Sequence, residues 1–447
     1  MNSNTSYGRL VLAILHLVLG VFLLIGIVAK VYSILIVVFG ILFIIKSKNE
    51  YNEAILWSAY LVGAEVLFRM SGGLFFYELS KYGVLLFLLI GLYIERKKHH
   101  ISVTYLVYIL LLLIGIAFVN IPFTESIRKA ITFNLSGPIL LGVSAIYFYK
   151  RKITLQKLMA MLFYMGLPVI SMLSYLFFET PDIKDIRFGG EANFATSGGF
   201  GPNQVATILG VGIFIIIIHL FLKKRIFSFL LADSFLLIYL IFRGLLTFSR
   251  GGIVTAFLAI GFFTFFYIRS TKDKLKNTFK FITLFVFLGI SLLLYTSNLT
   301  GGMLMNRYTN KNAAGIEKKD ITTGRATIFE TDIEGFLAHP FFGLGVGGSK
   351  FYRLDKLDSY AASHNEISRL LSEHGMIGLV ILFLLILVPI KNIRGQSNLA
   401  IAFLGAFFIF WFSTINHSAM RIAFPGFIYG LSLITFKKDE ETSLYRE

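Results

Sequence analysis

The chain has no cysteine among its 447 residues and little charge, since Asp, Glu, Lys and Arg make up only 15% of it. The absence of cysteine excludes disulfide bonds, thiolate zinc sites and cysteine nucleophiles. The shortage of charge excludes an ordinary soluble fold, because a globular protein of this length needs far more polar surface. Most of the molecular surface must therefore face an apolar environment.

Apolar residues dominate instead: 56% of the chain is hydrophobic and the mean hydropathy is +0.75. Apolar runs of about 20 residues match the thickness of a bilayer core. They predict an all-α polytopic integral membrane protein with about 12–14 transmembrane helices. Fourteen spans are expected at residues 10–29, 31–45, 54–69, 81–94, 101–119, 131–149, 155–178, 204–222, 226–242, 251–268, 279–297, 370–390, 399–415 and 422–436.

The net charge of +17 lies in short basic blocks between these runs, as at 46–48, 95–100, 150–152, 223–225, 269–276 and 437–438. Basic blocks of this kind are typical of cytoplasmic loops, so nucleic acid is not expected as a partner. The pattern predicts that both termini are cytoplasmic. The first apolar run follows few basic residues and no small-residue cleavage site, which predicts a retained span.

Two connecting segments are expected on the outer side and divide the chain into four parts. Residues 1–178 form the N-terminal spans, and 179–297 form the central spans after an outer loop at 179–203. Residues 298–369 form a large extracytoplasmic loop, and 370–447 form the last spans and a cytoplasmic tail. Within the large loop, 326–338 reads as an amphipathic helix that ends before Pro340. Its apolar side comprises Ile328, Phe329, Ile333, Phe336 and Leu337.

The stretch "SHNEISRLLSEHGMIGL" at 363–379 gathers titratable groups just before an apolar run. It predicts that His364 lies at the start of a helix, with Ser363 as the N-cap. A neutral imidazole at such a position, near solvent, suits a general base. The alternative is that His364 only caps a helix at the interface. His374 lies on a different helix face, so the two histidines do not predict a metal site.

Three further charged residues of this stretch, Glu366, Arg369 and Glu373, are three and four positions apart and share one helix face. One interpretation is that Glu366 and Arg369 form a surface pair that contributes little to stability. The other is that the face belongs to a catalytic rim around His364.

Arginines at predicted outer boundaries are the second notable set, because they run against the positive-inside tendency. They are Arg187, Arg243, Arg250, Arg325 and Arg421. A guanidinium offers a bidentate fork to phosphate, although an arginine at a span end often only reaches the interface. The glycine-rich turn at 198–206 adds Asn203, whose amide could bond a polar ligand. Within the spans, Glu65 with Arg69 could neutralise each other, and Asp233 could pair with a base or mark a substrate path.

Several of these motifs together resemble the O-antigen ligase and O-antigen polymerase superfamily of bacterial polysaccharide enzymes. They are "GFGPNQVA" at 199–206, "TFSRGG" at 247–252, "GR" at 324–325, "HPFFGLGVG" at 339–347 and the stretch at 363–379. The last is the most specific, and His364, Asn365, Glu373, Gly375 and Gly378 fit its pattern. One departure is Phe329, where a tryptophan is more usual.

The resemblance implies a GT-C-like membrane fold and a metal-independent, inverting glycosyltransferase without a cofactor. The donor would be a glycan on undecaprenyl diphosphate, and His364 would activate the acceptor hydroxyl. Arg250 matches a diphosphate ligand and Arg325 matches more weakly, whereas Arg187 and Arg243 are candidates from topology alone. Supporting roles fall to Asn203, Asn365, Glu366 and Glu373.

We therefore predict a polymerase of polysaccharide repeat units for O-antigen or capsule, acting on lipid-linked donor and acceptor at the outer face of the bacterial plasma (inner) membrane. Membrane lipid, a chain-length regulator and a flippase are the expected partners. A ligase that moves the finished glycan to another acceptor is the nearest alternative. The low Ala and high Lys, Ile and Phe content suggests an AT-rich genome and favours the polymerase. A lipid-linked oligosaccharide flippase is the alternative from another class.

Overall fold

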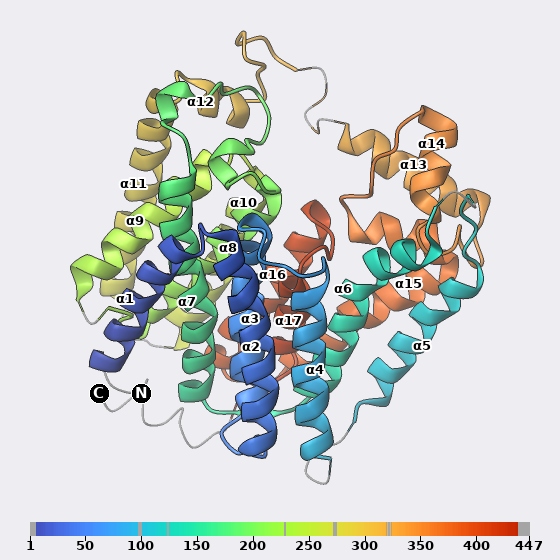
Figure 1. Ribbon diagram of the computed structural model, residues 1–447, viewed down its shortest axis with the longest axis horizontal. Coiled ribbons are helices and arrows are strands. Elements are labelled where there is room, and N and C mark those ends of the chain that lie inside the picture. Colours follow the sequence, from blue (N-terminus) through green and yellow to red (C-terminus); the bar gives the residue numbers. More distant parts are fainter. Residues whose placement is uncertain are drawn as a thin grey trace.

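A computed structural model describes residues 6–96, 101–122, 125–227, 229–270, 275–318, 320, 322 and 324–436. The predicted tail from residue 437 onward lies outside the described residues. Within them the chain is almost entirely helical (Figure 1). The helices are α1 (Ser6–Phe22), α2 (Gly26–Lys46), α3 (Glu53–Met70), α4 (Leu79–Ile94), α5 (Val103–Ala117), α6 (Ile127–Phe148), α7 (Leu155–Glu179), α8 (Pro202–Phe221), α9 (Leu230–Leu246), α10 (Arg250–Ser270), α11 (Leu275–Leu299), α12 (Met303–Tyr308), α13 (Arg325–Ala338), α14 (Gly348–Leu357), α15 (Glu366–Ile393), α16 (Asn398–His417) and α17 (Ala423–Leu431).

Two short 3-10 turns and one two-residue parallel strand pair complete the described elements. The turns are η1 (Ile183–Asp185) and η2 (Ala195–Ser197). Strand β1 (Lys152–Ile153) pairs with β2 (Thr435–Phe436), which brings the start of α7 beside the segment after α17.

The prediction of an all-α polytopic membrane protein is confirmed. Each of the fourteen predicted spans has a helix at its place, namely α1 to α11 and α15 to α17. Eight described helices are long and apolar enough to cross a membrane: α2, α6, α7, α8, α10, α11, α15 and α16. Helices α1, α4 and α5 are apolar but shorter. At nine residues, α17 measures about 14 Å and cannot span a bilayer core alone.

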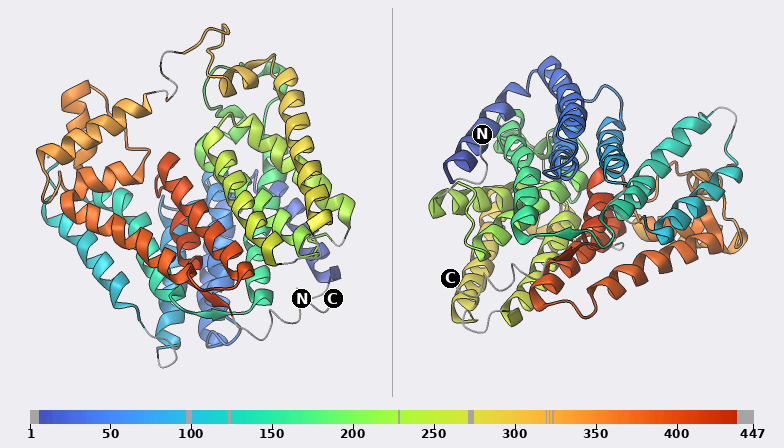
Figure 2. Two further views of the ribbon diagram at one scale, coloured as in Figure 1. Left: turned by 180° about the vertical axis from the view of Figure 1, so that it is seen from behind. Right: turned by 90° about the horizontal axis from the view of Figure 1, so that it is seen from below.

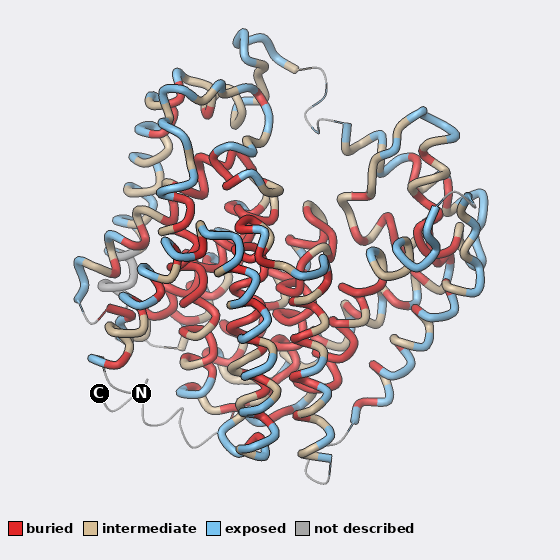
Figure 3. The backbone as a smooth tube through the Cα atoms, viewed as in Figure 1, coloured by how far each residue is buried: buried red, intermediate tan, exposed pale blue. Residues whose placement is uncertain are grey.

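The bundle interior depends on small residues that let helix backbones approach closely. A Cβ atom on Gly252 of α10 would lie 2.4 Å from the carbonyl carbon of Ala206 on α8. A Cβ atom on Gly63 of α3 would lie 2.2 Å from the carbonyl oxygen of Met165 on α7. Buried residues fill the centre of the bundle, and exposed apolar side chains cover the outer faces of helices such as α2 and α5 (Figure 3).

The charged residues predicted inside the spans have local partners. Arg69 forms an ion pair of 2.7 Å with Glu65, and the backbone N–H of Ala423 donates to Glu65 Oε2 at 2.5 Å. The prediction that Glu65 and Arg69 neutralise each other is therefore confirmed. Asp233 is buried and accepts from the backbone N–H groups of Ile226 and Phe227 at 3.0 and 2.9 Å, so it fixes the turn before α9.

Helices α12, α13 and α14 gather at one end of the bundle, hereafter the loop end. Figure 1 shows this end at the top, with the turn between α2 and α3 at the opposite end. The two faces seen in Figures 1 and 2 agree that α12 lies over α11 on one side, while α13 and α14 lie over α15 on the other. The described residues of the predicted large loop contain three short helices, and its part at 325–362, with α13 and α14, is hereafter the lobe.

The contact between the lobe and α15 depends on a backbone conformation that glycine adopts without strain. At Gly375 the helix is interrupted, with φ 60° and ψ −137°. A Cβ atom there would lie 2.5 Å from the carbonyl oxygen of Pro340, which accepts from the N–H of Met376 at 2.7 Å. The interruption separates the first turns of α15, which carry the titratable residues, from its long apolar part.

Helix α13 confirms the amphipathic helix expected at 326–338, but its apolar side is not the buried one. The buried residues are Thr331, Asp332 and Gly335, whereas Phe329 is 42% exposed and Leu337 is 68% exposed. The reason is that Asp332 is held by buried polar partners in α14 and α15, described below.

Candidate functional site

His364 lies at the loop end, in the two-residue approach to α15. The N-cap is Asn365, whose side-chain oxygen accepts from the N–H groups of Ile367 and Ser368 at 2.8 and 3.2 Å. The prediction of Ser363 as the cap is wrong, because the amide of Asn365 satisfies the first turn in its place. Asn365 also donates to the side-chain oxygen of Asn416 at 3.0 Å, which ties the approach to α16.

The surroundings of His364 are cationic and partly dry. The side chain is half-buried, and its Nδ1 is buried without a hydrogen-bond partner in the described structure. Burial, followed by the charges of Arg421, Arg325, Arg353 and His417, lowers the pKa of His364 to about 3. The imidazole is therefore neutral at physiological pH and able to accept a proton.

Three arginines from different elements form a second feature, hereafter the arginine triad: Arg250 begins α10, Arg307 lies in α12 and Arg325 begins α13. Burial lowers the pKa of Arg307, and the charges of Arg250 and Arg325 lower it further. Burial and the charge of Arg250 lower the pKa of Arg325. Three positive charges close together repel one another, and a bound anion would reduce this repulsion, so the triad is suited to an anion.

The arginine triad is held by neighbouring segments that the sequence analysis predicts on the same, outer side of the membrane. Arg307 donates to the carbonyl oxygens of Phe248 at 3.3 Å and of Gly190 at 2.9 Å. Asn203, at the start of α8, accepts from the hydroxyl of Ser249 at 2.7 Å, directly beside Arg250. The structure therefore brings together Arg250, Arg325 and Asn203, as the sequence predicted, and adds Arg307.

The other two predicted arginines lie apart from this group. Arg243 is only 4% exposed and donates from Nη2 to the Thr180 hydroxyl at 2.5 Å and to the Thr196 carbonyl oxygen at 3.0 Å. These bonds fasten the segment 180–196 to the end of α9. Arg187 is exposed and lines a separate hollow of about 380 Å³ together with Asp185 and Glu191.

The shared helix face predicted for Glu366, Arg369 and Glu373 is confirmed, but it is buried. These residues are 1%, 5% and 1% exposed. Arg369 forms ion pairs with both glutamates, at 2.8 Å to Glu373, and the Ser349 hydroxyl donates to Glu373 at 2.9 Å. The interpretation as a weak surface pair is therefore wrong, because the lobe covers the first turns of α15.

A second buried pair joins α13, α14 and the approach to α15. Arg353 forms an ion pair with Asp332, and both are at most 1% exposed. Asp332 also accepts from the hydroxyls of Ser368 at 2.7 Å and Ser363 at 3.3 Å. On the other side, Arg421 donates to the carbonyl oxygen of Ser363 at 3.1 Å. The residue before His364 is thus fixed from two directions.

A cavity of about 390 Å³, hereafter the polar cavity, opens between α6, α14 and the first turns of α15. Its lining includes Ser363, Glu366 and Arg421, so it reaches the segment that carries His364. No group of three or more histidine and acidic side chains suited to a metal ion is found among the described residues.

Comparison with known proteins finds a family that matches part of the chain. Residues 234–383 match the O-antigen ligase family, and this region runs from within α9 to within α15. The resemblance to the O-antigen ligase and polymerase superfamily is confirmed. No curated protein and no solved structure matches the chain.

The matched region, residues 234–383, contains His364, the whole arginine triad and both buried charge clusters, whereas Asn203 and Arg421 lie outside it in the chain. The family implies glycosyltransferase-like or ligase activity on lipid-linked polysaccharide in a membrane. Sequence reasoning missed Arg307, Asp332 and Arg353. No spacing pattern marks them, since each finds its partners from another element.

Proposed function

We propose that the protein is a repeat-unit polymerase. It transfers a glycan from undecaprenyl diphosphate to a hydroxyl of a lipid-linked acceptor repeat unit at the outer face of the plasma membrane. The observation that carries the proposal is a neutral histidine, His364, placed among arginines in an O-antigen ligase domain. This combination offers a proton acceptor beside a site for an anionic leaving group.

In the proposed reaction, the acceptor oxygen attacks the anomeric carbon of the donor glycan from the side opposite the diphosphate. The bond between that carbon and the phosphate oxygen breaks, and undecaprenyl diphosphate leaves with the electron pair. His364 accepts the hydroxyl proton, a role that contributes about 10²–10⁴-fold to rates of this kind. Attack from the opposite side inverts the anomeric configuration.

The arginine triad stabilises the negative charge that develops on the diphosphate. Guanidinium groups suit this role because they present paired N–H donors to phosphate oxygens. Arg250, Arg307 and Arg325 are the proposed ligands, and Asn203 supports Arg250 through Ser249. In this arrangement Arg243 positions the neighbouring segment through Thr180 and Thr196.

The proposed orientation rests on charge. The basic block at 46–48 follows α2 at the end of the bundle opposite the lobe (Figure 1). Cytoplasmic loops carry the excess of Lys and Arg, so the loop end is proposed to be extracytoplasmic.

The test is the length of the surface glycan, separated as a ladder on a gel, in cells that carry His364→Ala or Arg250→Ala at matched membrane expression. Arg128→Ala and Lys356→Ala are matched controls, because both residues are exposed at the loop end. We expect single repeat units from the first two variants and full ladders from the controls.

Other outcomes have distinct meanings. Loss of surface glycan with long chains still on the lipid carrier would identify ligation instead. An undisturbed ladder in His364→Ala would remove the proposed base.

A further inference from the structure

The polar cavity beside His364 has no part in the reaction as proposed above. Its volume of about 390 Å³ lies at the small end of the range of about 300–1,000 Å³ for small-molecule sites. It can hold one or two sugar rings, but not a repeat unit together with its lipid. None of its described lining residues comes from α8, α10 or α12, the elements that carry Asn203, Arg250 and Arg307. The cavity and the arginine triad are therefore built from different parts of the bundle.

The cavity and His364 share a wall. Ser363, which precedes His364 in the chain, lines the cavity and accepts from Arg421 at 3.1 Å. Arg421 also lines the cavity, and its charge acts on His364 more strongly than any other. In the described structure no carboxylate lies within ion-pair distance of Arg421, so its free donors remain available to a ligand.

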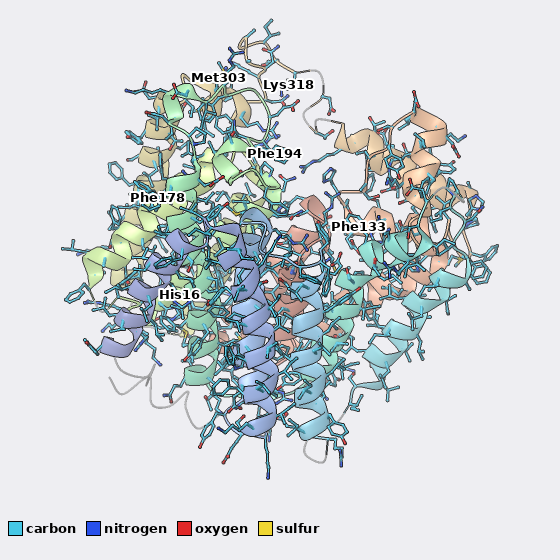
Figure 4. All side chains as sticks on the ribbon, viewed as in Figure 1. His16, Phe133, Phe178, Phe194, Met303 and Lys318 are labelled. Carbon is cyan, nitrogen blue, oxygen red and sulfur yellow. The ribbon has the colours of Figure 1, made fainter. Side chains whose placement is uncertain are left out.

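The lining combines aromatic rings with polar groups. Phe133 lies near the start of α6 (Figure 4), and Phe351 and Tyr360 line the cavity from the lobe. Glu366 and Asn134 contribute carboxylate and amide groups. A pyranose ring has the matching chemistry, because its C–H faces pack on aromatic rings while its hydroxyls donate to carboxylates. The carboxylate of Glu366 bonds Arg369 and still has unused lone pairs for a hydroxyl.

We propose that the polar cavity binds the terminal pyranose unit of the acceptor glycan and presents its hydroxyl to His364. This inference rests on the proposed function and assigns a place to its second substrate. The donor glycan then meets His364 from the side of the arginine triad and the acceptor meets it from the cavity. An inverting displacement needs this separation, since nucleophile and leaving group lie on opposite sides of the anomeric carbon. The cavity also limits recognition to the last one or two sugars, so it sets acceptor specificity.

The absence of cysteine from the chain allows a direct test by single-cysteine labelling. Ala130→Cys places a thiol in the cavity lining on α6, and Asp355→Cys places one on the exposed face of α14 as a control. Both are reacted with a bulky methanethiosulfonate in membrane vesicles, and completeness is checked by mass. Chain extension is then measured, together with the increase in Tm that undecaprenyl diphosphate gives the purified full-length protein.

We expect labelling to reduce chain extension at least tenfold in Ala130→Cys and to leave Asp355→Cys unchanged, with the Tm increase preserved in both. The oligosaccharide released from the lipid-linked repeat units by mild acid should slow labelling of Ala130→Cys only. Full chain extension by completely labelled Ala130→Cys would overturn the assignment of the cavity while leaving the proposed function intact. Absence of any Tm increase in the unsubstituted protein would overturn the proposed function and this inference with it.

Discussion

The buried pair of Arg353 and Asp332 allows a quantitative test of how the lobe is held. Replacing Arg353 by Met leaves Asp332 buried without its cation, and removing one partner of a buried pair costs about 3–5 kcal/mol. Both side chains are at most 1% exposed, so little solvent screening reduces this cost. Because the pair joins α13 and α14 to the start of α15, the loss should appear as local opening of the lobe. At about 1.4 kcal/mol per factor of ten, the opening equilibrium should increase by roughly 10²- to 4 × 10³-fold.

The assay is amide hydrogen exchange across 325–357 in the purified protein. Arg128→Met is the control at an exposed residue, and it should change the free energy of opening by about 0.5 kcal/mol or less. A double variant, Asp332→Asn with Arg353→Met, removes both charges and keeps an acceptor for the Ser368 hydroxyl. It should recover at least about 2 kcal/mol relative to the sum of the single variants, because no charge remains buried alone. Unchanged exchange in Arg353→Met, or strict additivity in the double variant, would refute this account of the lobe.

Three further predictions follow from single residues. With the pKa of His364 at about 3 in the empty site, the pH profile of kcat/KM should show no acid limb from this residue between pH 5 and 7. The negative diphosphate should raise this pKa in the donor complex, which shifts the acid limb of the kcat profile to higher pH. An acid limb near pH 6.5 in both profiles would contradict this. Gly375→Ala should lower Tm and chain extension, because alanine is strained at φ 60° and its Cβ would meet Pro340. The control, Gly261→Ala, has open space around it and should leave Tm unchanged or raise it slightly. Equal Tm values for the two variants would argue against the interruption of α15. Arg307→Lys keeps the positive charge but loses the paired N–H donors of the guanidinium group. Binding of undecaprenyl diphosphate should weaken about 10- to 100-fold, as expected for losing a hydrogen bond to a charged group. Unchanged binding would exclude Arg307 from the proposed role of the triad.

The helices were predictable because a bilayer imposes a strong length requirement on apolar runs. Each of the fourteen predicted spans coincides with a helix, within a few residues at most ends. The sequence predicts a helix start near His364 and a membrane span from 370, and α15 begins at Glu366. Its polar first turns, before the span, are stabilised by the cap of Asn365 and by the lobe. Hydropathy reports contact with lipid and carries no information about such a covered polar segment.

The site was predictable where one short stretch supplies several groups, and not where partners come from distant segments. The stretch at 363–379 contained His364 and the face of Glu366, Arg369 and Glu373, but its burial required α14 to cover it. Arg307 sits in a segment without any recognisable pattern, and its neighbours in the triad are 57 residues before and 18 residues after it in the chain. The amphipathic pattern of α13 indicated the helix correctly, yet Asp332 decides which side is buried.

The cations around His364 have a further consequence under the proposed function. In the empty site, burial lowers the pKa of His364 and the charges of Arg421 and Arg325 lower it further, so His364 is neutral but a weak base. A diphosphate bound at the arginine triad brings negative charge beside Arg325 and offsets its repulsion. The pKa of His364 must then rise, which strengthens the base only when the donor is present. Under this proposal Arg325 has two roles: it binds the leaving group, and in the absence of the donor its charge makes His364 a weaker base toward a hydroxyl or water.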